Sequence, residues 1–133
     1  ATQKILREYG ELLGTAFQIY DDCLDVFGTE DKAGKSLGTD LATGKATLPM
    51  LLALERANEI ERKSWRAMLQ AGESQADIER ERLVAEGIPA ACRMVGAGFV
   101  AQAISAVEDL PASSEPLVVL SECLTSQLAL LGD

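Results

Sequence analysis

The chain has 133 residues, 47% of them hydrophobic, which is enough to build the core of one compact domain. Its twelve basic residues are outnumbered by twenty-one acidic ones, and the net charge of −9 argues against general affinity for nucleic acid or anionic lipid surfaces. Histidine is absent, which excludes histidine-based catalytic triads and imidazole zinc sites.

The three cysteines, Cys23, Cys92 and Cys123, are widely spaced and match neither a metal-binding spacing nor a disulfide framework. A reducing cytoplasm is therefore the expected location. The sequence shows no signal peptide, and no apolar run reads as long enough to cross a bilayer. We therefore expect no stable membrane insertion.

The predicted elements, taken in chain order, are helices separated by turns and one long loop. The first helix is predicted over residues 2–28, where apolar side chains recur over about half of the helix circumference and predict burial on most sides. Residues 29–44 contain three glycines without an apolar period and read as a loop. No alternating β pattern stands out, so the prediction is one all-α domain comprising residues 1–133. Glycines and prolines divide the rest into helices over 45–57, 59–70, 74–86, 89–109 and 114–131.

Three aspartates of the segment FQIYDDCLD, residues 17–25, share one face of the first predicted helix. Gln18, Asp21, Asp22 and Asp25 follow one another at positions i, i+3, i+4 and i+7. Asp21 and Asp25 would repel each other by about 0.7 kcal/mol in water and by about 3 kcal/mol at an effective dielectric near 20. A divalent cation would offset this repulsion, and ligands that are all oxygen favour Mg²⁺. The same spacing is also typical of a solvated acidic helix face, so both interpretations stay open here.

The segment GKSLGTDLATGK, residues 34–45, places Lys35 and Lys45 each directly after a glycine, with Asp40 between them. The small residues let the backbone turn sharply, so that the lysines could reach an anion. Exposed turn lysines are the simpler interpretation of such a pair. A Walker A loop does not fit, because the glycines at 28 and 34, and at 38 and 44, enclose five residues where the motif needs four.

Together, FQIYDDCLDVFG and GKSLGTDLATGKATLPMLLAL resemble the second aspartate-rich region of the trans-isoprenyl diphosphate synthases, the polyprenyl synthetase family, from Gly14 to about Ala57. The shared pattern is F-Q-x-x-D-D-x-x-D, a spacer, G-K-x-x-G-x-D-L and G-K-x-T-x-P. The resemblance implies a helical bundle of the isoprenoid synthase type. It also implies a prenyltransferase of isoprenoid biosynthesis, in which an allylic diphosphate loses diphosphate and isopentenyl diphosphate attacks the resulting carbocation.

The resemblance implies a metal site as well, for Mg²⁺ or alternatively Mn²⁺. Asp21 would be the principal metal ligand and a catalytic residue, while Asp22 and Asp25 would hold the metal or its waters. In this family the metal ions grip the diphosphate of the allylic substrate. The partners implied for this chain are therefore an allylic prenyl diphosphate and isopentenyl diphosphate.

Four further residues receive roles from the same resemblance. Gln18 and Lys35 would contact the allylic diphosphate, Lys35 as a second catalytic residue, and Lys45 would lie beside that diphosphate. Phe17 would line the wall near isopentenyl diphosphate. The motif positions Asp40, Thr47 and Pro49 are expected to shape the loop and to start the next helix.

A complete synthase of this family has a first aspartate-rich motif and an upstream lysine and arginine site, and this chain shows neither. We therefore expect an inactive fragment that corresponds to the C-terminal part of the enzyme and forms a homodimer or a larger assembly. Two alternatives remain open. A class I terpene cyclase also uses an aspartate-rich helix, although the two glycine-lysine stretches fit the elongating synthases better. A noncatalytic subunit of a heteromeric synthase is disfavoured because all three aspartates and both lysines are retained.

Overall fold

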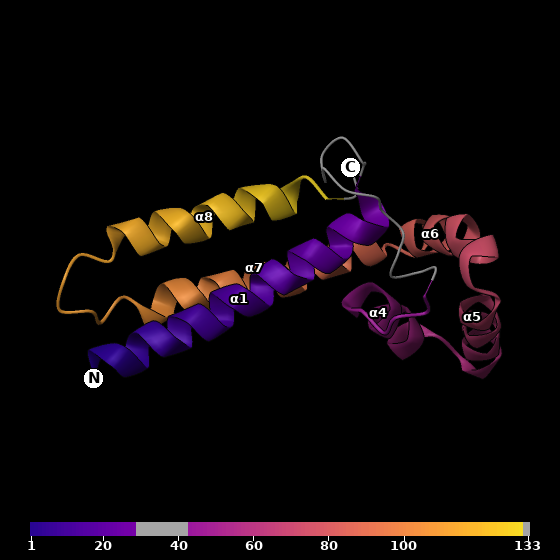
Figure 1. The fold of residues 1–133 in the computed structure, drawn as a ribbon, viewed down its shortest axis with the longest axis horizontal. Coiled ribbons are helices and arrows are strands. Elements are labelled where there is room, and N and C mark those ends of the chain that lie inside the picture. The colour runs from indigo at the N-terminus through magenta and orange to yellow at the C-terminus, as the bar shows by residue number, and fades with distance from the viewer. Residues whose placement is uncertain (29–42, 132–133) are drawn as a thin grey trace. The chain divides into compact units, whose positions relative to one another are not determined.

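The computed structural model describes residues 1–28 and 43–131, and within these ranges it contains helices and no strand. This confirms the all-α prediction, and every predicted helix has a counterpart. Most of the predicted loop 29–44 lies outside the described residues. The order is α1 (Thr2–Phe27), α4 (Leu48–Arg56), α5 (Glu59–Ala71), the 3₁₀ helix η1 (Gly72–Gln75), α6 (Ala76–Ala85), α7 (Ile88–Ala106) and α8 (Glu115–Ala129) (Figure 1).

Two helix boundaries differ from the predicted ones by three residues, and the others agree within two. The helix predicted from residue 45 begins at Leu48, because Pro49 has no N–H and is tolerated only in the first turn of a helix. The helix predicted to residue 109 ends at Ala106. Beyond it the backbone N–H groups of Val107 and Glu108 donate to carbonyl oxygens three residues earlier, which is the tight winding typical of a helix terminus.

The chain divides into two compact units. The first comprises Ala1–Tyr20 and Arg93–Leu130, and the second comprises Asp21–Cys92 and Leu131–Asp133. Helix α1 therefore contributes its larger, N-terminal part to the first unit and its last two turns to the second. The expectation that residues 1–133 form a single domain stays a prediction.

In the first unit, α1, α7 and α8 lie along one another (Figure 1) and enclose a small apolar core. Tyr9 stands at the centre of this core, and its hydroxyl donates to the Leu117 carbonyl oxygen at 2.8 Å and lies 3.1 Å from Ser121 Oγ. The buried hydroxyls of α1 and α8 thus bond each other across the core. Ala103 of α7 and Val107 of the turn that follows it complete the buried cluster. Partly buried apolar residues surround this cluster: Ile5, Leu12, Leu13, Leu110, Leu117 and Val118.

A glycine allows α7 to approach its neighbours in this unit. A Cβ atom placed on Gly96 would lie 3.0 Å from Leu128 Cδ1 of α8 and 3.6 Å from Ile19 Cγ2 of α1. The first distance is shorter than ordinary van der Waals contact, so even an alanine would require the Leu128 side chain to shift by a few tenths of an ångström.

The prediction that the first helix is buried on most sides is wrong for its N-terminal part. Leu6 is 44% exposed and Phe17 is 56% exposed. Within the first unit only α7 and α8 pack along this part of α1, and two helices cover too little of a half-circumference apolar arc. The last two turns of α1 match the prediction, since they bury Cys23, Leu24, Val26 and Phe27.

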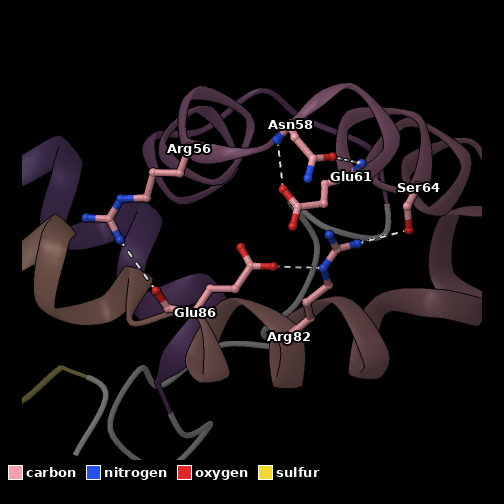
Figure 2. A network of polar contacts seen from close by, with 6 residues as sticks. All are labelled: Arg56, Asn58, Glu61, Ser64, Arg82 and Glu86. Atoms are coloured by element: carbon pink, nitrogen blue, oxygen red, sulfur yellow. Dashed lines mark hydrogen bonds and ion pairs between the residues drawn. The ribbon is translucent and has the colours of Figure 1, made fainter.

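The second unit contains α4, α5 and α6, with α4 in contact with both other helices, and Trp65 of α5 is fully buried. Arg82 of α6 places its guanidinium 4.0 Å from the centroid of the Trp65 ring, a cation–π contact. Arg82 also donates to Glu86 Oε1 at 2.9 Å and to Ser64 Oγ at 3.0 Å (Figure 2). One arginine thereby joins α6 to α5.

The start of α5 carries a complete capping box. The Asn58 side chain accepts a hydrogen bond from the Glu61 backbone N–H at 2.9 Å, and Glu61 Oε2 accepts one from the Asn58 N–H at 2.7 Å (Figure 2). Gly72 and Gly87, with φ of 65° and 72°, end α5 and precede α7 in the left-handed region that favours glycine. These two breaks stand where the sequence predicted them.

Helix α7 corrects one expectation about length. It is the one helix in the described part of the chain that is long and apolar enough, by length and composition alone, to cross a membrane. The core helix of a globular protein meets the same criteria, and α7 supplies the buried residues Val100 and Ala103.

Candidate functional site

The three predicted metal-binding aspartates lie on the last two turns of α1. Asp21 and Asp22 are half-buried, and Asp25 is only 7% exposed. A solvated acidic face would leave all three carboxylates open to water. Their burial therefore does not match a simple solvated face, because a carboxylate withdrawn from water requires compensating partners, and the metal site stays a prediction.

Lys45 is brought to this acidic face from the segment that precedes α4. Its Nζ lies 3.9 Å from Asp22 Oδ1, with the lysine side chain 56% exposed and the aspartate side chain 15% exposed. The backbone carbonyl of Lys45 accepts a hydrogen bond from the N–H of Thr47, the N-terminal cap of α4. The structure thus places Lys45, one of the two predicted lysines, beside the aspartates. The contact that it shows is with the Asp22 carboxylate, whereas the predicted contact was with a diphosphate.

Of the remaining predicted site residues, two lie on the exposed surface of α1 and two lie outside the described residues. Gln18 and Phe17 precede Asp21 on the continuous helix α1, and both are exposed. The Phe17 ring packs against Tyr20, with ring centroids 6.2 Å apart and planes tilted by 44°. Lys35 and Asp40 lie outside the described residues.

The aspartates of α1 are the donor set for the metal that the family resemblance implies. Within residues 1–28 and 43–131, no group of three or more His, Cys, Asp or Glu side chains is arranged to hold a metal ion. Carboxylates on successive positions of one helix do not surround a common point. They nevertheless fit Mg²⁺, which keeps several waters and takes one or two carboxylates together with substrate phosphates. The residues present would supply part of such a coordination sphere.

Sequence reasoning missed a buried thiol pair next to this face. In the second unit, the side chain of Cys92 from α7 hydrogen-bonds Cys23 of α1, and this bond, together with burial, raises the pKa of the Cys23 thiol far above its ordinary range. Cys23 therefore stays a neutral packing group and does not offer a thiolate to a metal. The only sequence signal was the position of Cys23 on the apolar arc.

A second missed feature is an apolar groove in the first unit, with a volume of about 500 Å³. Its lining includes Gly10, Gly14 and Phe17 of α1 together with Leu120, Cys123 and Leu124 of α8. Gly10, Gly14 and Phe17 fall on one helix face at i, i+4 and i+7, a spacing that could have indicated the groove from the sequence.

The family model for polyprenyl synthetase matches residues 1–86, about two thirds of the chain. The chain belongs to the polyprenyl synthetase family. The match includes all three aspartates and both lysines, so the motif resemblance and the family assignment rest on the same region.

Curated relatives extend the similarity over nearly the whole chain. A short chain isoprenyl diphosphate synthase of Methanothermobacter thermautotrophicus is 40% identical over 96% of this chain. An octaprenyl diphosphate synthase of Haemophilus influenzae is 38% identical over 91% of it. In both cases the alignment covers only 37% of the relative, so the chain spans little more than a third of the length of these enzymes.

A solved structure agrees with the fold. The polyprenyl synthase of Caulobacter crescentus, complexed with calcium and isoprenyl diphosphate, superposes with a TM-score of 0.81 at 34% sequence identity. The superposition covers 92% of this chain and 39% of that one. The all-α fold of the isoprenoid synthase type, expected from the motifs, is thereby confirmed.

Proposed function

We propose that this chain supplies the second aspartate-rich part of a Mg²⁺-dependent prenyltransferase, which elongates an allylic diphosphate with isopentenyl diphosphate. The observation that carries the proposal is the partly buried acidic face of α1 with Lys45 beside it, in a chain of this family. The relatives named above are prenyl diphosphate synthases. The Caulobacter crescentus relative, complexed with a divalent cation and an isoprenyl diphosphate, adds support.

In this proposal Asp21, Asp22 and Asp25 would hold the metal through their acceptor oxygens. When bound, Mg²⁺ would supply positive charge that stabilises the departing diphosphate. The half-buried setting of the carboxylates strengthens their hold on a cation, because the local dielectric is lower than that of water. Mn²⁺ would serve as a substitute, since it prefers the same oxygen ligands.

The remaining residues of the motif would bind and orient the diphosphate. The Lys45 ammonium would donate hydrogen bonds to its oxygens, and Lys35 would do the same on the strength of the family resemblance. The Gln18 amide would donate a further hydrogen bond from the preceding turn of α1. Phe17 would provide an apolar wall for the second substrate.

Elongation requires positive charge on more than one side of the diphosphate. The one aspartate-rich cluster of this chain would hold metal ions on one side. We therefore expect the isolated chain to form no elongated product when it is incubated with Mg²⁺, an allylic diphosphate and isopentenyl diphosphate. Radiolabelled isopentenyl diphosphate would detect product sensitively. Elongation by a purified monomer would show that one cluster is sufficient.

Calorimetry with methylenediphosphonate tests the binding part of the proposal. The chain should bind this probe when Mg²⁺ is present, and binding should disappear in chelator because no cation then joins carboxylate to phosphonate. Asp21→Asn should weaken the Mg²⁺-dependent binding at least about tenfold, since it removes a charged ligand of the metal. Asp77→Asn, at an exposed position of α6, is the matched control and should leave binding unchanged. Equal affinity in Mg²⁺ and in chelator would refute the proposal.

A further inference from the structure

The contact between Lys45 and Asp22 lies within the proposed diphosphate site, yet it joins a lysine to a carboxylate. We propose that Lys45 is an internal counter-ion of the acidic face and that it competes with the metal for Asp22 until diphosphate arrives. Lys45 would thereby make metal binding depend on diphosphate binding. The inference rests on the proposed function and deepens it, because it assigns a regulatory role at the same site.

The geometry of the pair suits an exchangeable contact. The distance of 3.9 Å between Lys45 Nζ and Asp22 Oδ1 is longer than a charge-assisted hydrogen bond, and the lysine side chain is more than half exposed. Asp22 is the less exposed partner, so its carboxylate has less water to replace a lost counter-ion. The backbone of Lys45 is held at the start of α4, while its four-carbon stem lets the ammonium move over several ångströms.

Electrostatics decides the direction of the coupling. A divalent cation that binds Asp22 would be repelled by an ammonium at the same carboxylate, so Lys45 has to leave when the metal enters without diphosphate. With diphosphate present, the displaced ammonium gains phosphate oxygens as new acceptors. Lys45 therefore opposes binding of the metal alone and favours binding of the metal together with diphosphate. Because such coupling is reciprocal, each ligand changes the affinity for the other by the same factor.

The test measures Mn²⁺ binding to the chain by electron paramagnetic resonance, with and without methylenediphosphonate. Without the diphosphonate, Lys45→Met should bind Mn²⁺ about fivefold more tightly than the wild type, the upper end of the range for a largely exposed ion pair. With the diphosphonate, the order should reverse, because the variant has lost a phosphate-binding cation. Lys63→Met removes the same charge from an exposed position of α5 and should leave both affinities unchanged.

A second variant tests whether Lys45 acts through Asp22. In an Asp22→Asn background, Lys45→Met should no longer tighten Mn²⁺ binding in the absence of diphosphonate. An equal gain in that background, or an equal gain with Lys63→Met, would overturn the inference. So would equal Mn²⁺ affinity of the wild type and Lys45→Met, an outcome that leaves the proposed function intact. Failure of the wild type to bind Mn²⁺ even with diphosphonate would overturn the proposed function, and the inference with it.

Discussion

The two units of the chain differ in how well their buried polar groups are hydrogen-bonded. In the first unit the Tyr9 hydroxyl bonds both a backbone carbonyl and Ser121, which lies fully buried on α8. In the second unit, within the described residues, the fully buried Glu79 has no hydrogen-bond partner for either carboxylate oxygen, and the indole N–H of Trp65 also has none. Since an unsatisfied buried polar group costs more than a satisfied one contributes, these two unpartnered groups are expected to weaken the second unit.

The largest effect is expected at Trp65, a large and fully buried side chain of the second unit. Trp65→Ala should lower the free energy of unfolding by about 3–5 kcal/mol, because it leaves a cavity and removes the contact with Arg82. Urea denaturation followed by circular dichroism would measure the loss. Arg66→Ala, at the exposed neighbouring position, should change stability by less than about 0.5 kcal/mol. A comparably small loss for Trp65→Ala would show that packing around this ring does not stabilise the unit.

The next largest effect is a gain in stability at Glu79. Glu79→Met keeps a side chain of similar length and removes two unsatisfied oxygens, so it should raise the free energy of unfolding at neutral pH by about 1–3 kcal/mol. Glu81→Met, at an exposed position of the same helix, is the control that should show no such gain. Destabilisation by Glu79→Met would mean that the buried carboxylate is satisfied in solution, which would remove the contrast between the units.

The gain in the free energy of unfolding from Glu79→Met should depend on pH. Burial raises the pKa of Glu79 above its ordinary value of 4.5, so the folded state holds the proton more tightly than the unfolded state. The stability that protonation of Glu79 contributes is present below about pH 4.5 and is lost as the pH rises through the folded-state pKa. The stability difference between Glu79→Met and the wild type should therefore grow as the pH rises from below about 4.5 to neutral. Thermal unfolding measured at a series of pH values would show this. A constant difference would argue against burial of the charge.

A smaller effect is expected for the satisfied group in the first unit. Tyr9→Phe removes the hydroxyl that joins α1 to α8 and should cost about 1 kcal/mol, part of it from the Ser121 hydroxyl left with one fewer partner. Differential scanning calorimetry would measure the change. Tyr20→Phe, on a half-buried tyrosine of the same helix, should cost less than about 0.5 kcal/mol. If both substitutions lower the free energy of unfolding equally, the hydrogen bonds of the Tyr9 hydroxyl do not stabilise the first unit.

The smallest effect on stability is expected at Phe17, which lines the groove and is more than half exposed. Phe17→Gln should change the free energy of unfolding by less than about 0.5 kcal/mol. It should nevertheless weaken the self-association expected from the exposed apolar residues of α1, because it removes a large apolar side chain from that surface. Sedimentation equilibrium would measure the association. Leu6→Gln, also on the exposed part of α1, shows whether the effect belongs to the groove or to any exposed apolar residue of this helix.

The sequence by itself determined the local features of this protein. Apolar periodicity predicted the extent of α1, Gly72 and Gly87 marked the breaks around α5 and α7, and the spacing of the aspartates placed them on one helix face. All of these depend on residues within about one helical turn of each other, where the backbone geometry is fixed.

Only the tertiary structure decided which of these faces are covered and which distant side chains meet. Phe17 is exposed and Asp25 is buried on the same helix, although side-chain type alone would favour the reverse. Glu79 belongs to a helix rich in charged residues, and yet it is fully buried. Lys45 meets Asp22 across an intervening segment of more than twenty residues. Such contacts depend on how whole helices pack, and no period within one helix encodes that packing.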